Sequence, residues 1–419
     1  MKTYARYKDS GISWIGEIPE HWEVSSLRKH LSFVSDKGHP DEQLLSVTRE
    51  CGVIIRNKES KEENHNFIPD DLSGYKLVRE GQFAINKMKS WQGSYAVSQY
   101  TGIVSPAYYI CDLHFDYKPF FNLAIRSKAY IPFFTMYSKG IRVDQWDLSP
   151  IGLKNIPFFI PPVSEQKAIV FYLDKKTEQI SIFVAAKQKQ IELLKEYKQS
   201  LIANAVTKGI NSKVKMKDSG ISWIGKVPEY WEKRKFQYLF KERSEKNHPN
   251  EPILCATQSH GVIPQSMYEN RVVVVNTGFE GLKLVKKGDF VISLRSFQGG
   301  IEYAHYQGII SAAYTILYIN TDCLDADYIR ILFKSFPFIN LLKICVTGIR
   351  EGQNINNDLL KKQFIPVPPI NEQKQIVAYI NERVSSIDAQ ISSIEKQIAN
   401  LNEYKQSLIS DVVTGKVKV

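Results

Sequence analysis

The sequence predicts an α+β protein in which two similar mixed globular domains are separated by two long antiparallel helices that form a coiled coil. Three observations predict this fold. The 419-residue chain repeats itself once, each repeat begins with short β-branched and aromatic runs bounded by glycine, and each repeat ends in a narrow apolar stripe with helical spacing. A chain of this length can bury a core in each of two or three domains.

The repeat is a duplication of almost the whole chain. KDSGISWIGEIPEHW begins at Lys8, and KDSGISWIGKVPEYW begins at Lys217. Further matches follow in the same order with a period of about 208 residues, which is too long for a solenoid and indicates duplicated domains. These matches pair residues 74–93 with 281–299, 101–110 with the segment from Gln307, 156–170 with 364–377, and 196–209 with 403–416.

The first part of each repeat predicts a mixed, strand-rich domain. Strands are predicted at LLSVT, GVII, GQFAI, GIVSPAYYI and RVVVVN, where β-branched and aromatic residues are bounded by turn residues. PFFNLAIRSKAYIPFFTM and ADYIRILFKSFPFINLLKI predict short helices within these domains. We therefore expect one globular domain at residues 1–155 and a second at residues 211–363.

The second part of each repeat, at residues 156–210 and 364–419, predicts a long helix. A proline pair, IPP or VPP, ends the extended chain, and Ser164 and Asn371 are the expected N-caps. Apolar residues then keep a 3-then-4 spacing over five or more heptads, which is typical of a coiled-coil seam. A helix of about 40 residues is roughly 60 Å long and overhangs a domain whose radius of gyration is about 15 Å. We favour pairing of the two stripes with each other over packing of each helix on its own domain.

Charge and composition restrict the function classes. The net charge of +11 and the pI of about 9.1 favour a polyanionic partner, although a basic protein without such a partner is the alternative. The sequence contains no run of 18 apolar residues and no apolar signal core at MKTYARYKDS, so we expect a cytoplasmic protein. Its five cysteines have no CxxC spacing, which argues against a zinc site and a disulfide framework.

The sequence also lacks the motifs of common catalytic sites. It contains no GxxxxGK[ST] phosphate loop and no Gly-rich loop in a setting that holds a nucleotide cofactor. The diprolines lack the Asn or Asp that an amino-methyltransferase places before them. The eight histidines show no metal-binding spacing. We therefore expect a binding protein with no catalytic residue, cofactor or metal of its own.

The motifs in this order resemble those of a known family, the specificity (S) subunit of type I restriction–modification systems. The resemblance rests on the SGISWIGEIPEHWE opening, the strand-rich domain, the PP-x-x-EQ start of a long helix and the EYKQSLI…VTG ending, and it covers essentially the whole chain twice. It implies two target recognition domains, each of which binds one half of a split asymmetric site in double-stranded DNA. It also implies that the two helices set the distance between these domains.

The resemblance implies partners as well. A subunit of this family is not an enzyme; it carries two methyltransferase (M) subunits, which bind S-adenosylmethionine, and recruits two ATP-dependent restriction (R) subunits. Two other function classes stay open at this point. One is a protein–protein scaffold that uses the same domains without DNA, and the other is an enzyme of unfamiliar pattern.

Candidate DNA contacts come from a comparison of the two repeats. Residues kept in both should serve the fold, phosphate contact or partner docking, whereas residues that read bases should differ. SWQG at 90–93 and SFQG at 296–299 predict either a DNA-contacting loop or a tight turn around a core aromatic. Arg295 is suited to a bidentate guanine contact. The candidates in these loops are Lys87, Lys89, Ser90 and Gln92 in the first repeat and Arg295, Ser296 and Gln298 in the second.

A second pair of segments, SVTRECGVI and CATQSHGVI, predicts two strands around a variable tip. In this tip Arg49 could contact guanine and Gln258 adenine. The alternative is a solvated hairpin tip without a DNA contact.

A third pair, SKGIRVDQW and TGIREGQNI, shares Gly-Ile-Arg. Because they are shared, Arg142 and Arg350 are predicted to contact phosphate or support the fold. The residues that follow, Gln145 in the first repeat and Gln353 and Asn354 in the second, are better candidates for base contacts.

Four tryptophans also recur at equivalent places. They could belong to the cores of the domains or to a docking surface for the methyltransferase, and we favour the core because large aromatic side chains are usually buried. They are Trp14, Trp22, Trp223 and Trp231.

Overall fold

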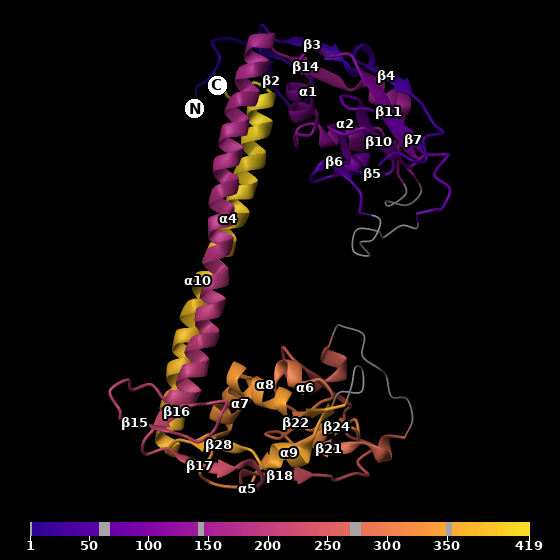
Figure 1. Cartoon of the computed structure of the whole chain (residues 1–419). Helices are drawn as coiled ribbons and strands as arrows, with labels where there is room; N and C mark the ends of the chain where they lie inside the picture. Colours follow the sequence, from indigo (N-terminus) through magenta and orange to yellow (C-terminus); the bar gives the residue numbers. More distant parts are fainter. Residues whose placement is uncertain (1, 58–67, 141–145, 269–277, 349–353) are drawn as a thin grey trace. The chain divides into compact units, whose positions relative to one another are not determined.

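A computed structural model of the chain describes residues 2–57, 68–140, 146–268, 278–348 and 354–419 (Figure 1). The chain divides into two units. Unit 1 consists of Met1–Lys187 and Lys396–Val419, and unit 2 consists of Gln188–Glu395. The long helices α4 (Val163–Lys208) and α10 (Ile370–Val413) each contribute residues to both units.

Unit 1 is built on a four-stranded antiparallel sheet with the order β4-β11-β8-β9. Among the described residues, five two-stranded antiparallel ladders and two short helices, α1 and α2, surround it, and α3 lies next to η1. The sheet strands are β4 (Leu31–Val34), β8 (Phe83–Asn86), β9 (Tyr95–Val97) and β11 (Tyr108–Leu113). The ladders are β1–β2 (Tyr7–Asp9, Glu17–Pro19), β3–β14 (Glu23–Ser26, Pro157–Ile160), β5–β6 (Leu45–Thr48, Gly52–Ile55), β7–β10 (Lys76–Val78, Gly102–Val104) and β12–β13 (Ser138–Lys139, Asp147–Leu148). The helices are η1 (Leu27–Lys29), η2 (Ser90–Gln92), α1 (Lys118–Ile125), α2 (Ile131–Met136) and α3 (Pro150–Asn155).

Unit 2 repeats this topology, with a four-stranded sheet of the order β18-β25-β22-β23. The sheet strands are β18 (Phe240–Arg243), β22 (Phe290–Ile292), β23 (Glu302–Tyr303) and β25 (Thr315–Ile319). The ladders are β15–β16 (Met216–Asp218, Lys226–Pro228), β17–β28 (Glu232–Lys235, Phe364–Val367), β19–β20 (Leu254–Thr257, Gly261–Pro264), β21–β24 (Lys283–Val285, Gly308–Ile310) and β26–β27 (Val346–Thr347, Asn354–Ile355). The helices are α5 (Phe236–Leu239), η4 (Gln265–Met267), η5 (Phe279–Gly281), α6 (Ser296–Gly299), α7 (Ala326–Lys334), α8 (Phe336–Ile344) and α9 (Asn357–Lys361).

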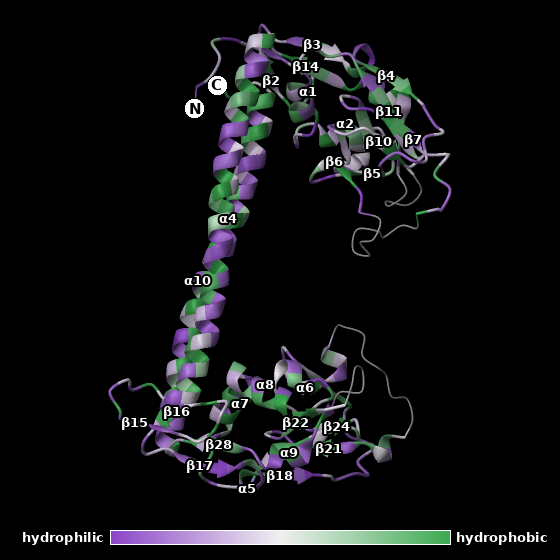
Figure 2. Ribbon diagram, viewed as in Figure 1, coloured by the Kyte–Doolittle hydropathy of each residue, from purple (hydrophilic) through white to green (hydrophobic). Residues whose placement is uncertain are grey.

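Both faces of the unit 1 sheet are covered, because successive side chains of a strand point to opposite faces. In β8, Phe83 and Ile85 pack in a large aromatic cluster with α1 and α2, whereas Ala84 packs in a second cluster with the β5–β6 and β7–β10 ladders. This alternation explains why all four residues of β8 are buried. Unit 2 has the matching second cluster, in which Val291 packs with Leu254 and Val262. The β5–β6 and β19–β20 hairpins are therefore fixed against the sheets of their units. Figure 2 shows apolar residues gathered on the inner strands of both units.

Within each unit, α4 and α10 pack against each other in antiparallel directions (Figure 1). In unit 1, Ile169 and Leu408 belong to one apolar cluster, and Lys405 Nζ donates to Ser181 Oγ at 3.0 Å. In unit 2, Lys198 pairs with Asp388 at 2.7 Å. The α+β fold class with two long antiparallel helices is thus confirmed.

The two helices begin two residues earlier than the predicted N-caps imply. α4 begins at Val163 and α10 at Ile370, so the prediction that Ser164 and Asn371 are N-caps is wrong. The carbonyl of Pro162 accepts from the backbone N–H of Gln166 at 2.9 Å, and the second helix uses Pro369 in the same way. Proline fits here because the start of a helix needs no backbone donor.

The repeated opening motif is explained by its contact with the start of the long helix. The indole N–H of Trp22 donates to Glu165 Oε2 at 3.0 Å, and the indole N–H of Trp231 donates to Glu372 Oε2 at 3.0 Å. Both tryptophans are buried, which confirms the core interpretation for this pair. Trp14 is 38% exposed and rests on Phe133, with ring centroids 4.7 Å apart.

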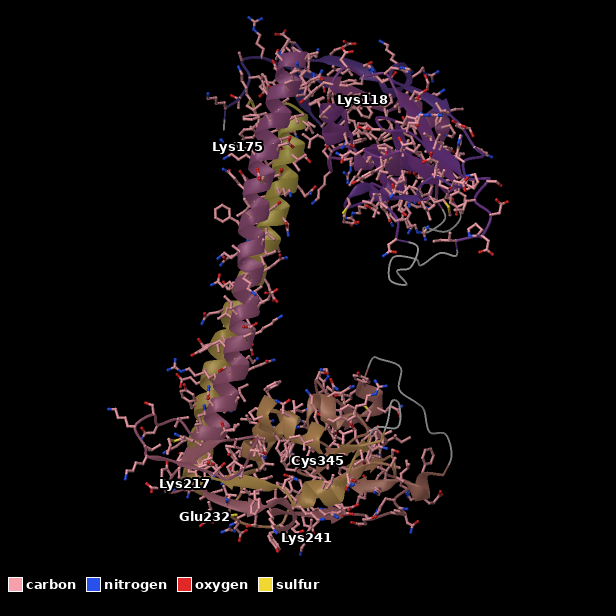
Figure 3. The ribbon with its side chains drawn as sticks, viewed as in Figure 1. Lys118, Lys175, Lys217, Glu232, Lys241 and Cys345 are labelled. Atoms are coloured by element: carbon pink, nitrogen blue, oxygen red, sulfur yellow. The ribbon has the colours of Figure 1, made fainter. Side chains whose placement is uncertain are left out.

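Several further features concern membrane spans, cysteines and metal sites. None of the described helices combines the length and the apolarity needed to cross a membrane. All five cysteines are free, and Cys345, labelled in Figure 3, is buried. Within the described residues no group of three or more His, Cys, Asp or Glu side chains is placed to hold a metal ion. The predicted strand RVVVVN, at residues 271–276, lies outside the described residues.

Candidate nucleic-acid interface

The first element of the candidate interface is the tip of a two-stranded hairpin in each unit. In the β5–β6 hairpin, Thr48 Oγ1 accepts from the N–H of Cys51 at 3.1 Å and donates to the carbonyl of Gly52 at 3.1 Å. Gly52 has φ of +73°, a conformation that favours glycine. The tip residues between Thr48 and Gly52 are exposed.

The second hairpin, β19–β20, has the same tip geometry. Thr257 Oγ1 accepts from the N–H of His260 at 3.0 Å and donates to the carbonyl of Gly261 at 3.0 Å, and Gly261 has φ of +71°. The two units therefore share a tip backbone and differ in the exposed side chains that it carries, Arg49-Glu50-Cys51 in one and Gln258-Ser259-His260 in the other. The predicted hairpins are confirmed.

The second element is the short helical turn that follows the central strand of each sheet. This turn is η2 in unit 1 and α6 in unit 2. Ser90 and Ser296 are buried, and their hydroxyls bond within the turn: Ser90 Oγ donates to the carbonyl of Lys87 at 3.2 Å, and Ser296 Oγ accepts from the N–H of Ser293 at 2.9 Å. Burial argues against the DNA contacts that the sequence suggested for these two serines, and we assign them to the fold.

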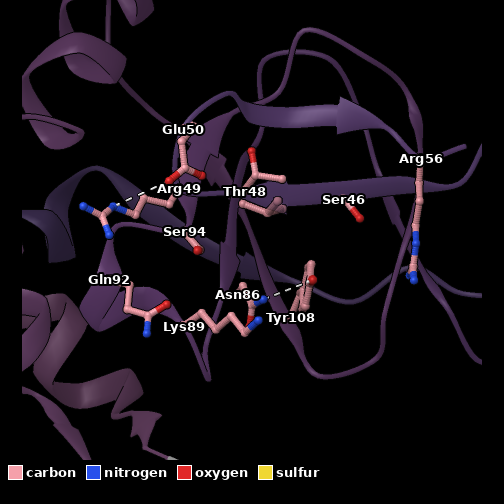
Figure 4. A pocket seen from close by; sticks show the side chains of 11 residues that line it. Ser46, Thr48, Arg49, Glu50, Arg56, Asn86, Lys89, Gln92, Ser94 and Tyr108 are labelled. Carbon is pink, nitrogen blue, oxygen red and sulfur yellow. Dashed lines mark hydrogen bonds and ion pairs between the residues drawn. The ribbon is translucent and has the colours of Figure 1, made fainter. Parts of the chain in front are cut away.

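The tip and the turn of unit 1 meet at a concave surface of about 360 Å³ (Figure 4). It brings together three of the candidates, Arg49, Lys89 and Gln92. In its floor, Asn86 Nδ2 donates to Tyr108 Oη at 3.1 Å, and Figure 4 shows Lys89 extending toward this pair. The lining residues are Ser46, Val47, Thr48, Arg49, Glu50, Arg56, Asn86, Lys89, Gln92, Ser94 and Tyr108.

This surface combines positive charge with neutral hydrogen-bonding groups. Three cationic side chains and one carboxylate line it, together with amides and hydroxyls. Cations suit phosphate oxygens or guanine, and amides can both donate to and accept from an adenine edge. The arrangement can therefore bind an anionic ligand that also presents hydrogen-bonding edges.

Lys87 does not line this surface. Its Nζ donates to Asp147 Oδ2 at 2.7 Å, and this hydrogen bond raises the pKa of Lys87. Because its ammonium is engaged by Asp147, Lys87 is a weaker candidate for DNA contact than Lys89, which is exposed.

In unit 2, Gln258 and the turn carrying Arg295 and Gln298 also lie together. A Cβ placed on Gly299 would lie 2.7 Å from Cδ of Gln258, so the Gln258 side chain covers this glycine. Arg295 and Gln298 are exposed, and the N–H of Gln298 donates to the carbonyl of Arg295 at 2.9 Å. Both exposed side chains thus project from a fixed turn. This turn, α6, is the equivalent in unit 2 of the η2 turn that carries Lys89 and Gln92 in unit 1.

The third pair of segments is only partly described. Asn354 is exposed and begins β27, where it pairs with Thr347 of β26. Four other candidates, Arg142, Gln145, Arg350 and Gln353, lie outside the described residues.

Sequence reasoning missed one pair of basic residues that the structure places behind the hairpin tips. Arg126 follows α1, and Lys334 ends α7. Arg126 donates to two backbone carbonyls of the tip in unit 1, and Lys334 donates to one backbone carbonyl of the tip in unit 2. The available signal was a basic residue followed by serine, Arg-Ser and Lys-Ser, at the end of the same short helix in both repeats.

Comparisons with known proteins agree with this architecture. Residues 221–403 match the family model described as the type I restriction modification DNA specificity domain. The chain is 24% identical to a Methanocaldococcus jannaschii protein named as the type I restriction enzyme MjaX specificity subunit, with 97% of this chain and 96% of the relative covered. It is 22% identical to the type I restriction enzyme EcoKI specificity subunit of Escherichia coli, with 96% and 90% covered.

Two solved structures share the fold. One is a chain from a study of complex assembly and conformational transition of the type I R-M system, with a TM-score of 0.65 at 14% identity over 96% of this chain and 99% of that one. The other is the HsdS subunit from Thermoanaerobacter tengcongensis, with a TM-score of 0.52 at 15% identity over 99% and 100%. Together these comparisons confirm the resemblance to the specificity subunits of type I restriction–modification systems.

Proposed function

We propose that this chain is the sequence-specific DNA-binding specificity subunit of a type I restriction–modification complex. In this proposal each globular domain, at residues 1–155 and 211–363, reads one half of a bipartite asymmetric site in double-stranded DNA. One observation carries the proposal: the two units present the same hairpin tip and the same turn with different exposed side chains. A shared scaffold with divergent contact residues is what two readers of different half-sites require.

The chemistry of the exposed residues supports a role in base contact. Arg295 can donate two parallel hydrogen bonds to guanine O6 and N7, and Gln258 can pair with adenine N6 and N7 in the major groove. In unit 1 the matching positions carry Lys89 and Arg49, which suit guanine or phosphate. The net charge of +11 adds a sequence-independent attraction to DNA.

The long helices complete the proposal. We assign to α4 and α10 the spacing of the two readers and the docking of two methyltransferase (M) subunits. Two readers joined by a stiff connection bind in a bivalent way, because the second contact is effectively intramolecular once the first has formed. In this proposal the chemistry belongs to partners: the M subunits bind S-adenosylmethionine, and the restriction (R) subunits use ATP.

Arg295→Ala should weaken DNA binding by about 1–3 kcal/mol and relax one base position in the half-site read by unit 2. The reason is the loss of a bidentate contact from an exposed guanidinium on a fixed turn. The measurement is the affinity of the chain in complex with its M subunits for a panel of single-base variants of the target, determined at several salt concentrations.

Lys89→Ala is the matched variant in unit 1 and should affect only the other half-site. An Arg295→Ala complex with unchanged affinity and an unchanged target would show that the α6 turn does not contact DNA. If the wild-type complex has no salt-dependent affinity for DNA, the alternative of a protein–protein scaffold replaces the proposal.

A further inference from the structure

A half-buried cation, Arg126, holds the hairpin tip of unit 1 from behind. Nη2 of Arg126 donates to the backbone carbonyl of Arg49 at 3.0 Å and to that of Glu50 at 2.9 Å. Nε of Arg126 is buried and has no hydrogen-bond partner among the described residues. A Cβ placed on Gly52 would lie 3.0 Å from Nη1, so the guanidinium also packs directly against the hairpin.

The corresponding cation in unit 2 has a wider set of partners. Lys334 Nζ donates to the carbonyl of Gln258 in the tip at 3.3 Å and to the carbonyl of Gly299 in the α6 turn at 3.0 Å. It also pairs with Glu302 Oε1 at 2.5 Å. Lys334 therefore ties the tip and the turn of unit 2 to each other.

Arg126 and Lys334 have different partners because the neighbouring edge strands, β9 in unit 1 and β23 in unit 2, carry different residues. Sheet register pairs Val97 with Phe83 in unit 1 and Tyr303 with Phe290 in unit 2, so Ala96 and Glu302 occupy equivalent places. Glu302 is 2% exposed, and burial raises its pKa. A buried carboxylate needs a cationic partner, and in unit 2 that partner is the lysine that holds the tip.

We infer that Arg126 and Lys334 are positioning residues for specificity, each of which sets the geometry of the tip that reads one half-site. The inference rests on the proposed function. Neither residue needs to touch DNA, because each acts through the tip backbone that carries Arg49 or Gln258. Side chains that discriminate bases must be fixed to within about 0.5 Å, and a tip without its anchor samples more positions.

Arg126→Gln tests the inference because every molecule contains its own control. The target methylated by the complex has two halves, and Arg126 is close to the reader of only one. We expect the variant to lose about tenfold or more in base discrimination at positions contacted by the β5–β6 tip, while the half-site read by unit 2 keeps its wild-type discrimination. The measurement is methylation of a target library by the purified complex, read by sequencing.

Two further variants sharpen the test. Arg126→Lys keeps a cationic donor, as unit 2 does naturally, and should restore most of the discrimination. The double variant Lys334→Gln with Glu302→Gln removes both members of the ion pair, so neither charge is left unpaired. It should relax only the half-site read by unit 2.

Loss of base discrimination that is equal at both half-sites would give Arg126 a purely structural role and would overturn the inference. Unchanged discrimination at both half-sites in Arg126→Gln would overturn it as well. Both outcomes are distinct from failure of the proposed function, in which the wild-type complex would show no bipartite target.

Discussion

Replacing Trp22 by alanine should lower the free energy of unfolding of unit 1 by about 3–5 kcal/mol. Trp22 is 0% exposed, and its indole N–H donates to Glu165 Oε2 at 3.0 Å. The substitution creates a cavity in the core and removes the bond between the opening motif and the start of α4. A denaturant titration that follows the unfolding of the purified protein measures the loss as a lower midpoint.

Trp14→Ala is the control for this prediction. Trp14 is 38% exposed, so its loss should cost clearly less, about 1–2 kcal/mol. Trp231→Ala should reproduce the Trp22 effect in unit 2, where the indole donates to Glu372. Equal destabilisation by Trp14→Ala and Trp22→Ala would show that the tryptophan–glutamate contact is not what holds the helix start.

Inserting four residues after Gln188 in α4, with four more after Gln397 in α10 to keep the helix lengths equal, should widen the gap between the half-sites by one or two base pairs. Each helical residue adds about 1.5 Å and rotates the following chain by about 100°, so four residues add about 6 Å and roughly one full turn. Base pairs are about 3.4 Å apart. Methylation sequencing of the variant complex gives the new gap directly.

An insertion of two residues at the same places is the matched control. It rotates the following chain by roughly 200°, which should misalign one reader and abolish methylation. Insertions also shift the seam of the coiled coil, so some loss of stability is expected with either length. An unchanged gap in a four-residue variant that still methylates would contradict the role of the helices in spacing.

The duplication made much of the fold predictable from the sequence. Several strands, the short helices and both long helices follow from local periodicity, and the helical segments were predicted once in each repeat. The start of α4 was misplaced because sequence patterns locate Ser164 as a good cap but do not reveal that Pro162 already supplies the first carbonyl to Gln166.

The candidate interface was harder to predict because it depends on contacts between distant segments. Ser90 looked like a contact residue in a shared motif, yet its hydroxyl bonds inside the turn. Arg126 carries no motif of its own, and its role follows only from the approach of α1 to a hairpin tip far away in sequence. Local sequence gives the type of a side chain, whereas tertiary packing decides whether it faces the ligand.

A map of methylated adenines, in the genome of cells that contain this chain together with its M subunits, shows whether the chain specifies a bipartite target. We expect one bipartite motif, with two short specific half-sites of different sequence and a gap of fixed length. We also expect that the motif disappears when the gene for this chain is deleted. A single continuous motif, or the same methylation in cells without this chain, would contradict the central claim.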